Sequence, residues 1–163
     1  MKKELADETD KTDEDKKYKL LAINLLFAFT VAISAILLDT DRLSRFIMQT
    51  SSPTLKDGME AVAFLVVWLL YGVVMGSNKK KDFTKFISFY WGIGGSISLT
   101  MLLGNFIAIP VFTFILAPTY GLGFFMNVGS SYFYDAMCII LSWSAGAIGY
   151  LLALLLNKLH IVE

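Results

Sequence analysis

The sequence predicts an all-α integral membrane protein, a four-helix transmembrane bundle with a re-entrant or interfacial segment between the third and fourth helices. Hydrophobic residues make up 56% of the 163-residue chain, more than the roughly 45–50% apolar content of soluble domains. Most of the charges are gathered into short blocks, which leaves four long apolar stretches almost free of charge. At about 1.5 Å of rise per residue, each stretch comes close to the roughly 30 Å thickness of a bilayer core.

The first apolar stretch follows a charged segment. Residues 1–19 contain seven acidic residues, six lysines and few apolar residues, so we expect them to form a disordered cytoplasmic tail. Residues 20–38 carry no charge and predict the first transmembrane span. A cleaved signal peptide is the alternative interpretation, but the preceding segment is too acidic and the apolar run too long for one.

The second span is predicted over residues 59–76. Two signals compete for the start of its helix. Ser52 followed by Pro53 offers an N-cap and a proline at the first helical position. Thr54 with Asp57 offers a capping box, in which each residue can accept a backbone N–H from the other. Either signal predicts a helix that begins before the apolar residues do.

The third span is predicted over residues 86–109, and Pro110 should end or kink it. Residues 110–133 carry no charge, but prolines and glycines interrupt them. A helix that continued through them would be much longer than a bilayer needs. We therefore expect this segment to bend at the interface or to re-enter the membrane, with an extra span as the third alternative. Residues 134–156 form the fourth span, and residues 159–163 form a short cytoplasmic end.

Lysines and arginines indicate the orientation of the bundle. Eight of them flank the predicted spans on the side of the two termini, and three lie on the other side. Because cytoplasmic loops carry the excess of basic residues, both termini are predicted to be cytoplasmic. Twelve lysines against two arginines favour a bacterial source, hence a bacterial cytoplasmic membrane. The basic residues expected to contact anionic membrane lipid are Lys79, Lys80, Lys81 and Lys85.

Small residues recur at every fourth position of the predicted third span. Such a ridge lets the backbone of another helix approach closely. The residues of this ridge are Ser88, Gly92, Ser96, Thr100 and Gly104. Gly146 and Gly149 give the fourth span a small-residue face of its own. The ridge has three interpretations: packing inside the bundle, an interface with a second copy or a partner membrane protein, or the lining of a pore.

Few polar residues lie within the predicted spans. Asn24 lies one turn into the first span and Asn105 near the outer end of the third, where an amide needs a hydrogen-bond partner on another helix. Glu60 and Asp135 lie at the outer rim, and Asp135 is the only charged residue from 86 to 157. These residues are candidates for a vestibule that attracts cations. Ordinary charge at the level of the lipid headgroups is the alternative.

The charges and motifs exclude several classes of function. The balance of 14 basic and 14 acidic residues argues against a nucleic-acid-binding protein. The sequence shows no cluster of metal ligands, no nucleotide loop, no cofactor motif and no catalytic acid–base pair. We therefore predict a small multi-pass membrane protein without enzymatic activity, acting as an oligomeric or accessory component. A small channel or transporter with an acidic outward vestibule is the alternative, and an enzyme acting on lipids is the third.

Overall fold

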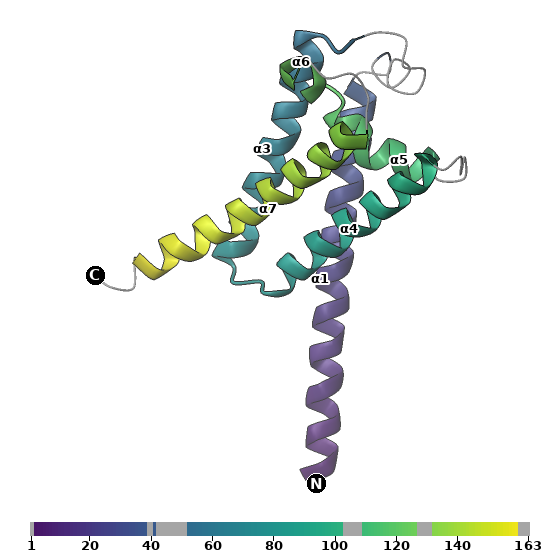
Figure 1. Cartoon of the computed structure of the whole chain (residues 1–163). Coiled ribbons are helices and arrows are strands. Elements are labelled where there is room, and N and C mark those ends of the chain that lie inside the picture. Colours follow the sequence, from purple (N-terminus) through teal and green to yellow (C-terminus); the bar gives the residue numbers. More distant parts are fainter. Residues whose placement is uncertain (1, 39–40, 42–51, 103–108, 127–131, 160–163) are drawn as a thin grey trace.

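The structure of the chain, a computed structural model, describes residues 2–38, 41, 52–102, 109–126 and 132–159. All of the secondary structure within these residues is helical. The elements are α1 (Lys2–Leu38), α3 (Leu55–Ser77), α4 (Asp82–Leu102), α5 (Ile109–Leu116), the 3-10 helix η2 (Ala117–Thr119), α6 (Leu122–Met126) and α7 (Tyr132–Leu159). Figure 1 shows the four long helices crossing one another at the centre, with the short elements near one end.

Within the residues that the structure describes, three segments are long and apolar enough to cross a membrane: Lys17–Leu38 in α1, all of α3, and Phe133–Leu159 in α7. Their outer faces carry large apolar side chains; Leu26 of α1 is 69% exposed and Leu155 of α7 is 58% exposed. Apolar surface of this extent is unfavourable in water and suits contact with lipid. The predicted class, an all-helical membrane protein, is therefore confirmed in the part of the chain that the structure describes.

The helices α3 and α7 form a parallel pair. Gly72 in α3 faces Gly146 in α7. Nearer the ends of both helices, the side-chain amide of Asn157 donates to the carbonyl oxygen of Ser77 at 3.4 Å. Both helices therefore end on the same side of the molecule, although more than fifty residues separate them in the sequence.

The helix α1 runs antiparallel to α3. Asn24 of α1 is hydrogen-bonded to Tyr71 of α3. Three residues further along α1, the ring of Phe27 lies 5.7 Å from the ring of Trp68, which precedes Tyr71 by three residues in α3. The amino-terminal part of α1 consequently leaves the molecule on the side where α3 ends. Figure 1 shows this part of α1 extending well beyond the other helices.

The helix α4 runs antiparallel to α7. The rings of Phe83 and Tyr150 lie 5.8 Å apart near the end of α7, whereas Gly95 faces Ile139 near its start. With 21 residues, α4 is about 31 Å long. It is less apolar than α3, α7 and the Lys17–Leu38 part of α1, and it does not count among the three segments named above.

Helix α1 begins at Lys2, where the sequence predicted a disordered tail over residues 1–19. From Lys2 to Leu38 the sequence contains no glycine and no proline, so no residue interrupts the helix that starts in the apolar span. Lysine, glutamate, alanine and leucine also have high helix propensity.

Of the two signals for the start of α3, the structure has the capping box. The backbone N–H of Thr54 donates to Oδ2 of Asp57 at 2.7 Å, and the backbone N–H of Asp57 donates to Oγ1 of Thr54 at 3.3 Å. Asp57 is fully buried despite its charge. Ser52 and Pro53 precede the helix without capping it.

Residues 103–108 lie outside the described part, so the predicted end of the third span at residue 109 is only partly visible. Helix α5 begins at Ile109 and has Pro110 in its first turn. Pro110 was expected to end a helix, but a proline in a first turn needs no hydrogen-bonded N–H. The eight residues of α5 cover about 12 Å. No described helix between α4 and α7 is therefore long enough to be an additional span.

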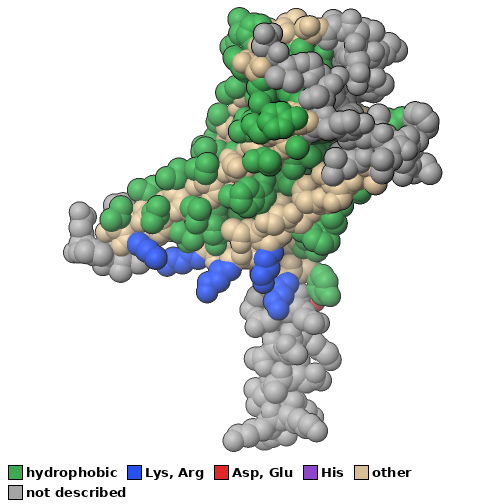
Figure 2. Space-filling view, viewed as in Figure 1, with side chains coloured by type: hydrophobic (Ala, Val, Ile, Leu, Met, Phe, Trp, Pro, Cys, Tyr) green, Lys and Arg blue, Asp and Glu red, His purple; other side chains and the backbone are tan. Residues whose placement is uncertain are grey.

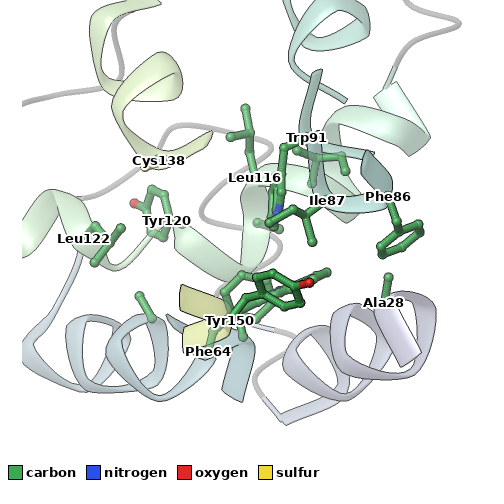
Figure 3. Close-up of a cluster of buried hydrophobic side chains, with 14 of the residues drawn as sticks. Ala28, Phe64, Phe86, Ile87, Trp91, Leu116, Tyr120, Leu122, Cys138 and Tyr150 are labelled. Atoms are coloured by element: carbon green, nitrogen blue, oxygen red, sulfur yellow. The ribbon is translucent and has the colours of Figure 1, made fainter. Parts of the chain in front are cut away.

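The core is a cluster of buried apolar side chains that come from α1, α3, α4, α5, α6 and α7 (Figure 3). Aromatic rings dominate its centre: Trp68 of α3 and Trp91 of α4 lie 5.4 Å apart, and Phe64 and Tyr90 also contact Trp91 edge-on. The indole N–H groups of Trp68 and Trp91 are buried and have no hydrogen-bond acceptor among the described residues. Ring packing therefore holds α4 against α3.

Candidate functional site

The closest helix contact lies between α3 and α7, and glycines make it possible. A Cβ on Gly72 would overlap the carbonyl oxygen of Gly146, and a Cβ on Gly149 would overlap the carbonyl oxygen of Leu69. A Cβ on Gly76 would overlap the carbonyl of Tyr150 in the same way. The backbones thus touch along the interface, as the close-approach interpretation of small residues requires. Gly146 and Gly149, the two small residues that the sequence singled out on the fourth span, both lie in this contact with α3.

The small-residue ridge of α4 lies differently. Ser88, Gly92 and Ser96 are exposed and Thr100 is half-buried, while Gly104 lies outside the described residues. A Cβ on Gly92 would meet no atom of the described residues within 4 Å. Among these residues, the glycines of α3 and α7 lie against the other helix, and Gly92 does not.

The hydroxyl groups of this ridge already have partners within the chain. Ser96 donates to the carbonyl oxygen of Gly92 at 2.9 Å, and Thr100 donates to the carbonyl oxygen of Ile97 at 2.7 Å. Ser88 accepts the indole N–H of Trp143 at 3.1 Å. The exposed ridge can therefore face lipid or another helix without a further polar partner.

A second feature is the break in helical structure between α5 and α6. Residues 115–123 of this segment are buried. The hydroxyl of Tyr134 in α7 accepts the backbone N–H of Gly123 at 3.0 Å and lies 2.6 Å from the carbonyl oxygen of Tyr120, to which it can donate. Backbone groups that leave a helix inside a membrane protein need such partners. The side chain of Tyr134 thus forms hydrogen bonds with the backbone between α5 and α6.

The segment between α5 and α6 also packs against the first turn of α3. A Cβ on Gly121 would overlap the carbonyl group of Asp57 and come within 2.6 Å of the backbone nitrogen of Gly58. On Gly58, a Cβ would lie 2.8 Å from the ring of Phe125 and 3.4 Å from the carbonyl oxygen of Gly121. The prolines and glycines of residues 110–133 predicted an interruption here, but nothing in the sequence indicated that its partners are α3 and Tyr134.

Asn24 has the interhelical partner that the sequence predicted. The hydroxyl of Tyr71 donates to Oδ1 of Asn24 at 2.6 Å, and Asn24 is almost fully buried. The Tyr71 ring also stacks on Phe27 of α1, with ring centroids 3.6 Å apart. Sequence reasoning did not identify Tyr71, because tyrosine in a span also suits the membrane interface. Asn105 lies outside the described residues.

A double-mutant cycle of Asn24→Ala and Tyr71→Phe should show a coupling free energy of about 0.6–1.7 kcal/mol, the range of interhelical hydrogen bonds in membrane proteins. Tyr71→Phe keeps the ring that stacks on α1 and removes only the hydroxyl. The measurement is the free energy of unfolding of the purified protein in detergent for the wild type, both single variants and the double variant. Strictly additive effects would contradict the hydrogen bond.

The two candidate vestibule acids lie at the end of the molecule where α3 and α7 begin. Glu60, in the second turn of α3, forms an ion pair with Lys56 at 3.7 Å. Asp135 lies in the first turn of α7 and is half-buried. A carboxylate there is favoured by the positive end of the helix dipole. The structure thus places both acids at one end, as predicted, on two different helices.

The opposite end of the molecule is basic. The chain turns from α3 into α4 through Lys79, whose φ of 54° lies in the left-handed region that favours glycine. The turn is closed by the N–H of Lys79 on Gly76 and by the N–H of Lys80 on Met75, at 2.9 and 3.0 Å. Figure 2 shows basic side chains along this edge of the molecule. The exposed lysines here are Lys79, Lys80, Lys81, Lys85 and Lys158.

Within the described residues, no group of three or more histidine, cysteine, aspartate or glutamate side chains is arranged to hold a metal ion. Comparisons of the chain with protein-family models, with curated proteins and with solved structures give no match. Three features of the described residues bear on function: the outward ridge of α4, the break between α5 and α6, and the two charged ends.

Proposed function

We propose that the protein is a small membrane component without enzymatic activity, which associates with a second copy of itself through the exposed ridge of α4. In this proposal α4 is a fourth transmembrane span and the protein lies in a bacterial cytoplasmic membrane. A partner membrane protein with a similar ridge is the related alternative. The observation that carries the proposal is the open face at Gly92.

The arrangement of the helices supports α4 as a span. It is about 31 Å long, and it lies antiparallel to α3 and α7 across the centre of the molecule. A chain whose helices α1, α3, α4 and α7 alternate in direction has both termini on one side. The lysines at the ends of α3 and α7 support the cytoplasm as that side.

In the α3–α7 contact, Gly72, Gly76 and Gly149 each lie against a backbone carbonyl of the other helix. Gly92 has the same pattern of small neighbours, four residues before and after it, yet no atom of the described residues fills its face. The exposed rings beside the ridge, such as Phe89 at 71% exposure, give a neighbouring helix apolar surface to contact. Van der Waals packing of this kind drives helix association in lipid.

Gly92→Leu combined with Ser96→Leu tests the proposal. Two leucines would fill the ridge and keep a neighbouring helix away, so the oligomer expected for the wild type should become a monomer. Ala63→Leu is the matched control, because Ala63 is an exposed small residue on α3. The measurement is the mass of the protein in mild detergent and in lipid nanodiscs. A monomer before and after the substitutions would contradict the proposal.

The break between α5 and α6 favours a second candidate function, a small channel or transporter with an acidic outward vestibule. In channels, non-helical backbone buried within the protein commonly lines the path of the solute. The break lies at the end that carries Glu60 and Asp135. This candidate predicts cation flux into liposomes that Asp135→Asn reduces, with Asp41→Asn as the control because Asp41 is exposed at the same end. Flux that is absent or indifferent to Asp135→Asn would remove this candidate.

A further inference from the structure

The break between α5 and α6 lies between the starts of two long helices. Its residues 115–123 are all buried. On one side, Gly121 lies against the carbonyl group of Asp57, in the first turn of α3. On the other side is Tyr134, in the first turn of α7 and only 5% exposed. The segment is thus held between α3 and α7 without belonging to a long helix.

The hydroxyl of Tyr134 lies within hydrogen-bond distance of two carbonyl oxygens of this segment, 2.6 Å from that of Tyr120 and 2.9 Å from that of Thr119. A hydroxyl group has a single proton. It can therefore donate to only one of these carbonyl oxygens at a time. Thr119 is 1% exposed, so its carbonyl group is shielded from bulk water.

Two further donors at the same place are weaker. The N–H of Gly123 is shared between the hydroxyl oxygen of Tyr134, at 3.0 Å, and the carbonyl oxygen of Tyr120, at 3.3 Å. The thiol of Cys138 lies 3.8 Å from the carbonyl oxygen of Thr119, and a thiol is a weak donor. Of these three donors, the hydroxyl of Tyr134 makes the shortest contacts with the segment.

We propose that Tyr134 is a latch. Its hydroxyl holds residues 115–123 against α7, and its release opens the segment to water and presents the carbonyl oxygens of Thr119 and Tyr120 to a small monovalent cation. The inference rests on the second candidate function, the small channel or transporter, and names the site at which that protein binds its cation.

The chemistry of the closed segment favours such a release. A water molecule has two protons, so it can donate to both carbonyl oxygens and replace the hydroxyl without loss of hydrogen bonds. Once the segment is open, these oxygens are also suitable cation ligands. Carbonyl oxygens of non-helical backbone coordinate cations in many membrane proteins.

The surroundings of the latch also suit a cation. Asp135 follows Tyr134 directly and is half-buried. From residue 86 to residue 157 the sequence contains no lysine and no arginine, so α5, α6 and the first turns of α7 bring no positive charge to the break. Lys56, on α3, forms an ion pair with Glu60.

The native thiol of Cys138 can report the opening, because it is 1% exposed and lies beside Thr119 in the closed protein. In lipid nanodiscs, the wild type should react slowly with a small, charged, water-soluble methanethiosulfonate. Tyr134→Phe keeps the ring and removes the hydroxyl. The reaction should then be at least about fivefold faster, the shift that loss of one ordinary hydrogen bond produces. An unchanged rate would overturn the latch.

Tyr71→Phe is the matched control, since it removes another interhelical hydroxyl bond of 2.6 Å and should leave the rate at Cys138 unchanged. Met75→Cys, with Cys138→Ala, places a buried thiol 18 residues from Asp57 along α3, about 27 Å away. Tyr134→Phe should not accelerate its reaction. Equal acceleration at both thiols, or by Tyr71→Phe, would overturn the inference, because it would show a general loss of packing.

The cation is tested in the open variant. With Tyr134→Phe, K⁺ or Na⁺ should slow the reaction of Cys138 relative to N-methylglucamine at equal ionic strength, because the larger cation does not fit between two carbonyl oxygens. Tyr134→Phe should also raise K⁺ or Na⁺ flux into liposomes. A fast reaction at Cys138 that neither ion slows would overturn the cation site.

The inference and the second candidate function fail in distinguishable ways. Flux that Asp135→Asn reduces, together with an unchanged rate at Cys138 in Tyr134→Phe, overturns the latch and leaves the channel or transporter standing. A faster reaction that K⁺ or Na⁺ slows, without flux in either protein, supports the latch and its cation site and overturns transport.

Discussion

Gly72→Ala is expected to lower the free energy of unfolding by about 3 kcal/mol, at the upper end of what overpacking a tight contact costs. The added methyl group would overlap the carbonyl oxygen of Gly146 and approach the backbone nitrogen of Tyr150 to 3.0 Å. Backbone atoms on a helix cannot rotate away as a side chain can, so α3 and α7 must separate. The measurement is unfolding of the purified protein in detergent.

Gly92→Ala is the matched control, because it makes the same chemical change inside another long helix. The new methyl group meets no atom within 4 Å, and alanine is favoured over glycine in a helix by about 1 kcal/mol. Under conditions where the protein is monomeric, Gly92→Ala should therefore leave stability unchanged or raise it. Equal losses at Gly72 and Gly92 would mean that the α3–α7 contact is not as close as the structure describes.

Gly121→Ala is also expected to have a large effect, a loss of about 2–3 kcal/mol in the free energy of unfolding, as in other overpacked sites. Its methyl group would overlap the carbonyl group of Asp57, which belongs to the capped first turn of α3. The break between α5 and α6 must then move away from α3. We expect a cysteine placed at Thr119 or Leu122, both buried, to react faster with a water-soluble thiol reagent in the Gly121→Ala variant.

Gly58→Ala is the control on the other side of this contact. There the methyl group meets the far edge of the Phe125 ring at 2.8 Å, and this half-exposed side chain can turn aside. A loss below about 1 kcal/mol follows, since a volume change that the neighbours can absorb costs little. A loss at Gly58 as large as that at Gly121 would show that the two positions share one rigid contact.

The existence of the long helices could be predicted from the sequence because it depends on the amount of apolar surface and on the cost of placing charge in lipid. For the start of α3 the sequence offered two local signals, Ser52 with Pro53 and Thr54 with Asp57, and the second caps the helix. Both features depend on residues close together in the chain. No knowledge of the other helices was needed for either.

The partners of the small residues could not be predicted. Gly72, Gly92 and Gly149 all lie in ridges of small residues, and the pattern states only that a backbone can come close. Which ridge is covered depends on how α3 and α7 lie side by side. The strongest ridge in the sequence, on α4, is the one that faces outward, and the shorter ridges of α3 and α7 form the contact.

The break between α5 and α6 was predicted in part. Proline and glycine indicate where a helix is interrupted, since these residues weaken it locally. They do not indicate which groups accept the freed backbone. Here the hydroxyl of Tyr134 accepts the backbone N–H of Gly123, and the backbone of Asp57 and Gly58 lies against Gly121. A tyrosine near the start of a span also suits the membrane interface, so these hydrogen bonds to backbone could not be predicted from the sequence.

The parallel pairing of α3 with α7 has a consequence for biogenesis. During synthesis at about 5–20 residues per second, the ribosome needs roughly 4–16 s to pass from the end of α3 to the end of α7. Throughout that interval the glycine face of α3 has no partner from its own chain. Until α7 has been synthesised, the face of α3 that contacts it therefore stays uncovered. A chain released before residue 132 lacks α7 and cannot form this contact.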